Sequence, residues 1–352
     1  MKRLISVLFL LAVLLCGCEK VPAETETTEK TKYSDYSFDF FDTVTTIVGY
    51  EKTEEEFKAV CEDIKSLMKE YHQLYTVYNR YDGVENLCTL NRTASEGAVK
   101  VDEKIIGMLS FSKEMYELTG GRTNIAMGSV LSIWHDHREA GMNDPVSAEL
   151  PDMRDLQEAA KHTDINDLVI DIDNNTVFYN DPELKVDVGA VAKGYAVEAV
   201  AQWLESEGKN GYILNVGGNV RAVGAKGDGT PWTVGIENPD TEDEAEPYIA
   251  YLSLENMAVV TSGSYQRYYV VDGVEYHHII DPETLMPGEK FRSVSVICKD
   301  SGLGDALSTS LFLMTYEEGL QLVDSLEDVE AMWVTHDGEQ LYSSGFESFF
   351  VK

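Results

Sequence analysis

Basic residues are scarce in this chain of 352 residues. Lysine and arginine together number 28, against 62 aspartates and glutamates, and the formal net charge is −34. Because so acidic a chain repels a phosphate backbone, we expect no nucleic-acid partner. An anionic small-molecule ligand would need local compensation, either from a lysine or from a divalent cation that carboxylates hold.

Cysteine is also scarce, and several common site motifs are missing. Cys61, Cys88 and Cys298, which follow two cysteines near the N-terminus, are widely spaced and fit no zinc-binding pattern. A Cys61–Cys88 disulfide and three buried free thiols are both open. The chain has no H-E-x-x-H or G-x-S-x-G motif, and NVGGNV lacks the spacing of a dinucleotide-binding fingerprint.

No hydrophobic run is long enough to span a bilayer comfortably. The apolar stretch over residues 4–15 follows two basic residues and is typical of a signal peptide. It ends on Leu-Cys-Gly-Cys, which resembles the lipobox of bacterial lipoproteins; an ordinary signal peptide cleaved nearby is the alternative. We expect residues 1–17 to be removed. Lipidated Cys18 would then anchor the protein to the cell membrane, facing outside the cytoplasm.

The rest of the chain reads as a tether followed by one domain. Residues 18–35 are polar and rich in threonine, which predicts a disordered tether, and residues 36–352 form the domain. Helical periodicity and turn signals predict helices at 53–79, 103–121, 130–140, 196–208, 302–314 and 316–326, and strands or hairpins at 37–50, 167–180, 211–238, 258–281, 293–300 and 329–344. This mixture favours an α+β fold with a largely antiparallel sheet and packed helices.

A single lysine stands among small residues in VDVGAVAKGYA, residues 186–196. Lys193 lies where an alternating stretch gives way to a helical one. Backbone N–H groups at a helix start point toward an anion, so this turn could receive a phosphate. The structural alternative is that small residues let a helix pack closely on a sheet.

Two further stretches carry groups suited to chemistry. Asp305 and Thr309 are four residues apart, so on a helix they share a face and could offer oxygen to Mg²⁺. Asp305 is expected in the first helical turn, where capping is the alternative role. In HHIIDPETLMP, His278 precedes a turn and could act as a general base, or be structural. On a strand His277 would point to the opposite face.

Five motifs in one order resemble a known family: VDVGAVAKGYA, NVGGNV, VVTSGSYQRYY, HHIIDPETLMP and GDALSTSLF. They are similar to blocks of the FAD:protein FMN transferases, the ApbE-type lipoproteins. The likeness extends from about Phe38 to the C-terminus. The resemblance implies an ApbE-like α+β fold, FAD as a substrate, dependence on Mg²⁺, and transfer of FMN to a threonine or serine of an acceptor flavoprotein with release of AMP.

The resemblance also implies a set of site residues. The metal would be held by the backbone carbonyl of Ala190 and by Asp305 and Thr309, while His278 and Asp305 would serve catalysis. Lys193 would contact the cofactor, and Ile280 would line the flavin site. Phe41, Tyr78 and Asn124 complete the expected cofactor-binding residues.

The chain departs from the family pattern at several positions. Phe41 stands where methionine is frequent, and Asn124 stands where many members have aspartate. Leu285 replaces the usual glycine after D-P-x-T, so we expect the turn to differ, with Gly288 supplying backbone freedom. The acceptor motif D-G-x-[ST]-G-[AS]-T is absent, so modification is expected in trans. An FAD pyrophosphatase and a flavin-binding lipoprotein without transfer activity are the alternatives.

Overall fold

The computed structural model describes residues 30–240 and 246–352. Its largest element is an eight-stranded sheet, in which every neighbouring pair is antiparallel. The strand order is β1 (Thr31–Phe40), β2 (Thr43–Glu51), β6 (Tyr212–Val216), β7 (Asn219–Val223), β10 (Ala258–Gly263), β13 (Ser293–Cys298), β14 (Glu330–Val334) and β15 (Gln340–Tyr342). The predicted α+β fold with a largely antiparallel sheet is confirmed.

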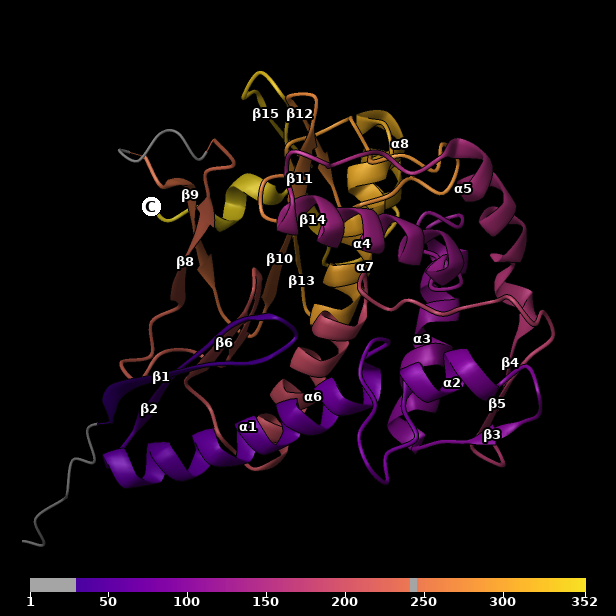
Figure 1. Cartoon of the computed structure of the whole chain (residues 1–352). Coiled ribbons are helices and arrows are strands. Elements are labelled where there is room, and N and C mark those ends of the chain that lie inside the picture. The colour runs from indigo at the N-terminus through magenta and orange to yellow at the C-terminus, as the bar shows by residue number, and fades with distance from the viewer. Residues whose placement is uncertain (1–29, 241–245) are drawn as a thin grey trace, which may run out of the picture.

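Helices cover one face of this sheet (Figure 1). They are α1 (Glu54–Tyr75), α6 (Ala192–Ser206), α7 (Ser301–Leu313) and α8 (Tyr316–Asp324). Their apolar sides pack on alternate residues of the strands, such as Val294 and Val296 of β13. The hairpin of β8 (Trp232–Glu237) and β9 (Tyr248–Leu254), with η3 (Phe346–Phe349), packs on the other face.

The remaining elements lie beside α6 and α7. They are α2 (Leu87–Thr93), α3 (Glu103–Leu118), α4 (Gly128–Asn143), α5 (Met153–Ala159), η1 (Ala160–His162), η2 (Ile165–Asp167), the small sheet of β3 (Val99–Lys100), β5 (Thr176–Tyr179) and β4 (Leu168–Asp171), and the hairpin of β11 (Tyr268–Val271) and β12 (Val274–His277). In Figure 1, α4 crosses in front of α7. Its Trp134 packs in a small core with Tyr269 of β11.

The helix starts follow from local sequence. Thr53 caps α1 by accepting from the backbone N–H of Glu56 over 3.1 Å, and three glutamates occupy the first turn. Thr315 caps α8 in a capping box with Glu318. The helices α2 and α5 were not predicted; each has only seven residues, too few to show a helical period.

The beginning of the domain corrects two expectations. Residues 37–50 do not form one strand, because Phe41 and Asp42 adopt positive φ angles of 53° and 51° and turn the chain between β1 and β2. The predicted tether extends too far, since Thr31–Asp35 pair with β2. The ring of Tyr33 also stacks on Phe57 at 5.5 Å. The predicted signal peptide, Cys18 and the tether up to residue 29 lie outside the described residues.

The domain contains three cysteines, and the structure shows whether any two of them are bonded. Cys61, Cys88 and Cys298 are buried and free, so the Cys61–Cys88 disulfide is wrong. Burial raises the pKa of the Cys61 thiol to about 12, which keeps it protonated. Across residues 30–240 and 246–352, no helix has both the length and the apolar character needed to cross a bilayer.

Candidate active site

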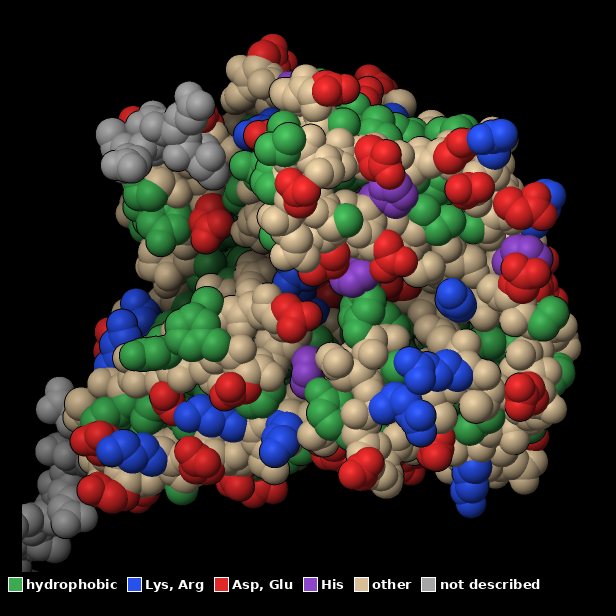
Figure 2. Space-filling model, in the orientation of Figure 1, with side chains coloured by type: hydrophobic (Ala, Val, Ile, Leu, Met, Phe, Trp, Pro, Cys, Tyr) green, Lys and Arg blue, Asp and Glu red, His purple; other side chains and the backbone are tan. Residues whose placement is uncertain are grey.

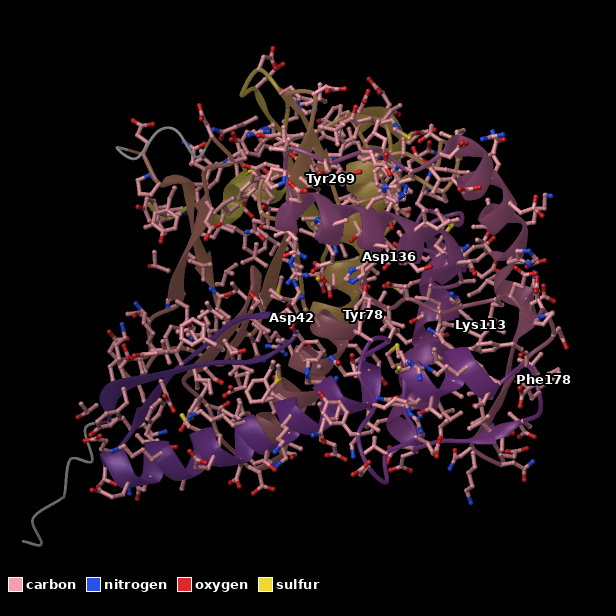
Figure 3. All side chains as sticks on the ribbon, in the orientation of Figure 1. Asp42, Tyr78, Lys113, Asp136, Phe178 and Tyr269 are labelled. Atoms are coloured by element: carbon pink, nitrogen blue, oxygen red, sulfur yellow. The ribbon has the colours of Figure 1, made fainter. Side chains whose placement is uncertain are left out.

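A cavity of about 600 Å³ opens between the tip of the β1–β2 hairpin, the segment after α1, α4, the start of α6 and the face of α7 from Asp305 to Leu313. Figure 2 shows basic, acidic and histidine side chains gathered where this face is hollowed. In Figure 3, Asp42 of the hairpin tip and Tyr78 lie below Asp136 of α4. All the predicted site residues line this one cavity: Phe41, Tyr78, Asn124, Ala190, Lys193, His278, Ile280, Asp305 and Thr309.

The cavity concentrates positive charge in an acidic protein. Four basic residues line it, Lys193, Arg122, Arg138 and Arg267, against three aspartates, Asp42, Asp187 and Asp305. Burial raises the pKa of Asp187 and of Asp305, which weakens their negative charge. Arg122 pairs with carboxylates outside the cavity core, including Glu283 at 3.0 Å. Neither Arg138 nor Arg267 forms an ion pair with any described carboxylate. The site is therefore suited to an anionic ligand, the local compensation that the overall charge requires.

Two helices meet at the floor of the cavity through a glycine. Gly194 of α6 donates its backbone N–H to Oδ2 of Asp305 on α7 over 2.7 Å. A Cβ at position 194 would lie 2.3 Å from the carbonyl oxygen of Ser301 and 2.5 Å from Cβ of Asp305. Only glycine allows this approach. The close-packing role of the small residues is thus real, and it brings Asp305 to the turn that carries Lys193.

Asp305 does not cap its helix. The N-cap of α7 is Asp300, whose carboxylate accepts from the backbone N–H groups of Gly302 and Leu303. Asp305 lies in the second turn instead of the first, and its side chain is only 6% exposed. Burial raises the pKa of Asp305, against the opposing effects of the Lys193 ammonium and the Gly194 N–H.

The oxygen atoms around Asp305 suit a hard cation. Oδ1 of Asp305 has Nζ of Lys193 at 3.9 Å, beyond hydrogen-bond distance. Thr309 lies one helical turn further on and faces the cavity, as does Ala190. Carboxylate, hydroxyl and carbonyl oxygens are the ligands that Mg²⁺ prefers. Among the described residues no three His, Cys, Asp or Glu side chains are grouped to hold a metal. Asp305, Thr309 and the Ala190 carbonyl include only one carboxylate, so they suit a cation that takes its remaining oxygen ligands from a bound phosphate.

Lys193 is the second residue of α6, at the helix N-terminus. Its Nζ donates to the carbonyl oxygen of Gly217 over 3.1 Å, in the turn between β6 and β7. No side chain caps α6, whose N-cap position is Val191. The N–H groups of Ala192 and Gly194 at this helix start are already bonded, to Val188 and Asp305. The ammonium of Lys193 and the positive end of the helix dipole are therefore what favour a phosphate here.

His278 lies opposite, and its proton position follows from its partner. Nδ1 lies 3.2 Å from the carbonyl oxygen of Arg267. Because a carbonyl only accepts, Nδ1 carries the proton and Nε2 keeps a free lone pair. Burial, with the charges of Arg267 and Arg138, lowers the pKa of His278 to about 3. His277 points away into the core, where it packs edge-on against Phe312, as alternation along a strand predicts.

Hydrogen bonds from two other segments fix the tip of the β1–β2 hairpin. The backbone N–H of Phe41 donates to Nδ1 of His72 over 3.1 Å, and Arg267 donates to the carbonyl oxygen of Asp42 over 3.0 Å. These bonds hold a bulky residue in the left-handed region, which otherwise costs of order 1–3 kcal/mol. Phe41 is thereby fixed at the cavity mouth.

Aromatic and apolar groups form another wall. The ring of Tyr78 stacks on His135 of α4, with centroids 4.4 Å apart and planes inclined by 26°. Tyr78 is 49% exposed, and Ile280 is 7% exposed. A flat, partly exposed ring pair beside a buried aliphatic side chain suits a planar heteroaromatic ligand.

Asn124 has a structural task that aspartate could not perform. Its Nδ2 donates to the carbonyl oxygen of Thr163 over 3.0 Å, and its Oδ1 accepts from the N–H of Ala126 over 2.9 Å. A carboxylate lacks the donor for Thr163. Asn124 therefore holds the cavity wall, which separates the cavity from a second, polar hollow of about 550 Å³.

The expectation about Leu285 is wrong. Leu285 itself adopts the left-handed conformation that favours glycine, with φ of 61°. Its N–H donates to Asp281, and its carbonyl accepts from Nε1 of Trp134 over 2.9 Å. Gly288 does not have a positive φ; a Cβ there would lie 2.6 Å from Cδ2 of Leu313. Packing, rather than backbone freedom, requires that glycine.

Some cavity residues escaped sequence reasoning. They are the basic and histidine side chains His72, His135, Arg138 and Arg267. His135 and Arg138 are three residues apart on α4 and contact each other at 3.0 Å, but neither is linked by spacing to His72 or Arg267. Only Arg267 had an available signal, since it falls in the motif VVTSGSYQRYY.

The chain is similar to known proteins over most of its length. The ApbE family model matches residues 41–333. An FAD:protein FMN transferase of Klebsiella pneumoniae (strain 342) is 30% identical over 292 residues, covering 82% of this chain and 85% of the relative. One of Vibrio cholerae serotype O1 is 29% identical over 343 residues, covering 97% of each chain.

Solved structures share the fold. The crystal structure of the ApbE protein from Thermotoga maritima matches with a TM-score of 0.79 at 29% identity, covering 92% of this chain and 100% of that one. The flavin transferase ApbE from Vibrio cholerae matches with a TM-score of 0.75 at 25% identity, covering 91% and 100%. The family model covers most of the chain and the fold agrees with these structures, so the chain belongs to the ApbE family.

Proposed function

We propose that this protein transfers FMN from FAD to a threonine or serine hydroxyl of an acceptor flavoprotein, with Mg²⁺ and with release of AMP. The curated relatives carry the name of this activity. The observation that supports it most is the convergence of Lys193, His278 and Asp305 on one cavity from α6, the segment after β12, and α7.

The transfer makes one bond and breaks one. The acceptor oxygen forms a bond to the FMN-side phosphorus of FAD, the bond from that phosphorus to the bridging oxygen breaks, and AMP leaves. The hydroxyl proton must go to a base. Catalysis of this kind depends on positioning and on charge compensation at the phosphates.

The proposed roles follow from the positions of the side chains. Lys193 and the start of α6 hold the diphosphate of FAD, and the ring pair of Tyr78 and His135 contacts the flavin. Ala190, Asp305 and Thr309 would hold Mg²⁺, which when bound neutralises charge on the diphosphate and aligns the attack. Asp305 supplies the only anionic ligand of this set.

His278 is the proposed general base, acting through Nε2. Its Nδ1–H is directed at the Arg267 carbonyl, which leaves Nε2 as the acceptor. The low pKa keeps Nε2 unprotonated at neutral pH. A phosphate anion nearby raises the pKa of a histidine, so substrate binding would strengthen the base when it is needed.

We also propose that the mature chain begins at a lipidated Cys18 and works on the outer side of the cell membrane. The lipobox-like Leu-Cys-Gly-Cys supports this. Acceptors would then be membrane proteins or proteins of the same compartment, carrying a motif similar to D-G-x-[ST]-G-[AS]-T.

Product analysis tests the proposed reaction. The purified protein is mixed with FAD, Mg²⁺ and an acceptor domain that carries the motif, beside the same domain with its acceptor threonine changed to alanine. We expect FMN on the first domain only. Free FMN and AMP from both mixtures would indicate a pyrophosphatase, and unchanged FAD would indicate a flavin-binding protein without transfer activity.

A further inference from the structure

Asn219, the first residue of β7, is the most unusual polar residue near the cavity. It is fully buried, with 0% exposure. Its Nδ2 makes no hydrogen bond with any described residue. A buried donor without a partner lowers stability, because it loses its hydrogen bonds to water. Such a group requires an explanation beyond packing, because an apolar residue would avoid this cost.

The amide is fixed in one orientation. The hydroxyl of Ser301, at the start of α7, donates to Oδ1 of Asn219 in a very short hydrogen bond. Ser301 is itself held, since its backbone N–H donates to Oε2 of Glu198 over 2.9 Å. Glu198 is locked by Arg221, whose Nε lies 3.0 Å from Oε2. This buried chain of contacts joins α6, β7 and α7 and leaves Nδ2 as the free end.

Nδ2 of Asn219 lies beside the contact between Gly194 and Asp305. A Cβ placed on Gly194 would lie 2.5 Å from Cβ of Asp305 and 3.0 Å from Nδ2 of Asn219. The two side chains therefore meet at the same point of α6. An amide N–H that lies beside a carboxylate attracts it.

We infer that Asn219 is a positioning residue for Asp305. With Gly194 fixing Oδ2, the Asn219 amide sets the rotation of the carboxylate so that Oδ1 faces the cavity. This rests on the proposed function, in which Asp305 is a ligand of Mg²⁺. Outer groups that orient a metal ligand typically change metal affinity 10- to 100-fold when removed.

The test measures metal binding directly, with Mn²⁺ as a paramagnetic substitute for Mg²⁺. Mn²⁺ is titrated into the full chain, with and without FAD, and free Mn²⁺ is read by electron paramagnetic resonance. We expect Asn219→Leu, which keeps the branched shape of the side chain and removes the amide, to raise the Mn²⁺ dissociation constant ~10-fold or more. Ser301→Ala, which frees the amide to rotate, should raise it less.

The control is another buried asparagine. Asn86 is also 0% exposed but caps α2 and donates to the carbonyl oxygens of Gln73 and Asn79. Asn86→Leu should lower thermal stability more than Asn219→Leu and leave Mn²⁺ affinity unchanged. A common loss of affinity in both variants would show a general effect of destabilisation and overturn the inference.

Asp305→Asn separates this inference from the proposed function. If Asp305→Asn loses Mn²⁺ affinity while Asn219→Leu and Ser301→Ala bind Mn²⁺ like the wild type, Asn219 does not position the ligand. If Asp305→Asn also binds Mn²⁺ like the wild type, the cation is held elsewhere and the proposed metal site fails with the inference.

Discussion

The backbone N–H of Gly194 and the carboxylate of Asp305 form a 2.7 Å hydrogen bond that joins the first turn of α6 to the second turn of α7. The residues are 111 positions apart in the chain. This contact brings together two motifs that are far apart in the sequence: the turn that carries Lys193 and the face of α7 that carries Asp305 and Thr309. The predictions below follow from this junction and from the cavity above it.

Asp305→Asn should fold and lose most Mg²⁺-dependent transfer. Asparagine can still accept from Gly194, and burial raises the pKa of Asp305, so removing the charge should not lower the melting temperature. Asp300→Asn is the matched control, since asparagine caps α7 about as well as aspartate. Thermal melts and single-turnover rates of both variants check this; full activity in Asp305→Asn would contradict the metal role.

Gly194→Ala should be destabilised by ~1–3 kcal/mol and should lose transfer. The added Cβ would meet Ser301 and Asp305 and push α6 from α7. Gly97→Ala is the control, because nothing lies within 4 Å of a Cβ there. Urea unfolding of the two variants provides the measurement. If Gly194→Ala were as stable as Gly97→Ala, α6 and α7 would be able to move apart without a loss of folding free energy.

His278→Gln should bind FAD but transfer FMN ~10²–10⁴ times more slowly. The exposed His336→Gln, outside the cavity, should keep the wild-type rate. Stopped reactions at saturating FAD give the rates, and flavin fluorescence gives the binding. An unchanged rate would leave His278 with a structural role alone.

The same variant should change how stability depends on pH. The unfolded chain protonates His278 near its ordinary pKa of 6.5, whereas the folded chain does so only at about 3. Between these values the unfolded state binds more protons, so this residue lowers stability as pH falls from 6.5 toward 3. His278→Gln should lose less stability than the wild type between pH 7 and pH 5 in urea unfolding. A parallel loss would show that His278 is solvated.

Tyr78→Ala should weaken FAD binding ~10-fold, by about 1–1.5 kcal/mol, through loss of ring stacking. Tyr251→Ala on β9 removes a ring of similar exposure, 51%, outside the cavity and should bind FAD normally. Quenching of flavin fluorescence gives both affinities. If the two variants bind alike, Tyr78 does not contact the flavin.

Local signals predicted much of the fold. The helix predicted at 53–79 and the hairpin strands predicted within 258–281 both appear in the structure. The β1–β2 turn was missed because Phe41 and Asp42 give no turn signal, and their positive φ depends on bonds from His72 and Arg267, which are distant in sequence. Leu285 is a similar case, since Trp134 stabilises a conformation that leucine alone disfavours.

The site was predictable where motifs exist. The order of the motifs led to the cavity residues, but spacing alone could not separate capping from metal binding at Asp305. The structure answers this question because it shows that Asp300, and not Asp305, is the N-cap of α7. Asn219 lay in NVGGNV, which was tested only as a nucleotide fingerprint. Its role depends on Ser301 and Glu198, contacts that no local pattern encodes.

The stoichiometry of the products distinguishes FMN transfer from hydrolysis of FAD. The protein is incubated with FAD, Mg²⁺ and an acceptor domain; AMP is measured by chromatography and attached FMN by the mass of the intact acceptor. We expect one AMP for each FMN attached to a threonine or serine, and neither product with Asp305→Asn. AMP released with free FMN and an unmodified acceptor would contradict this expectation.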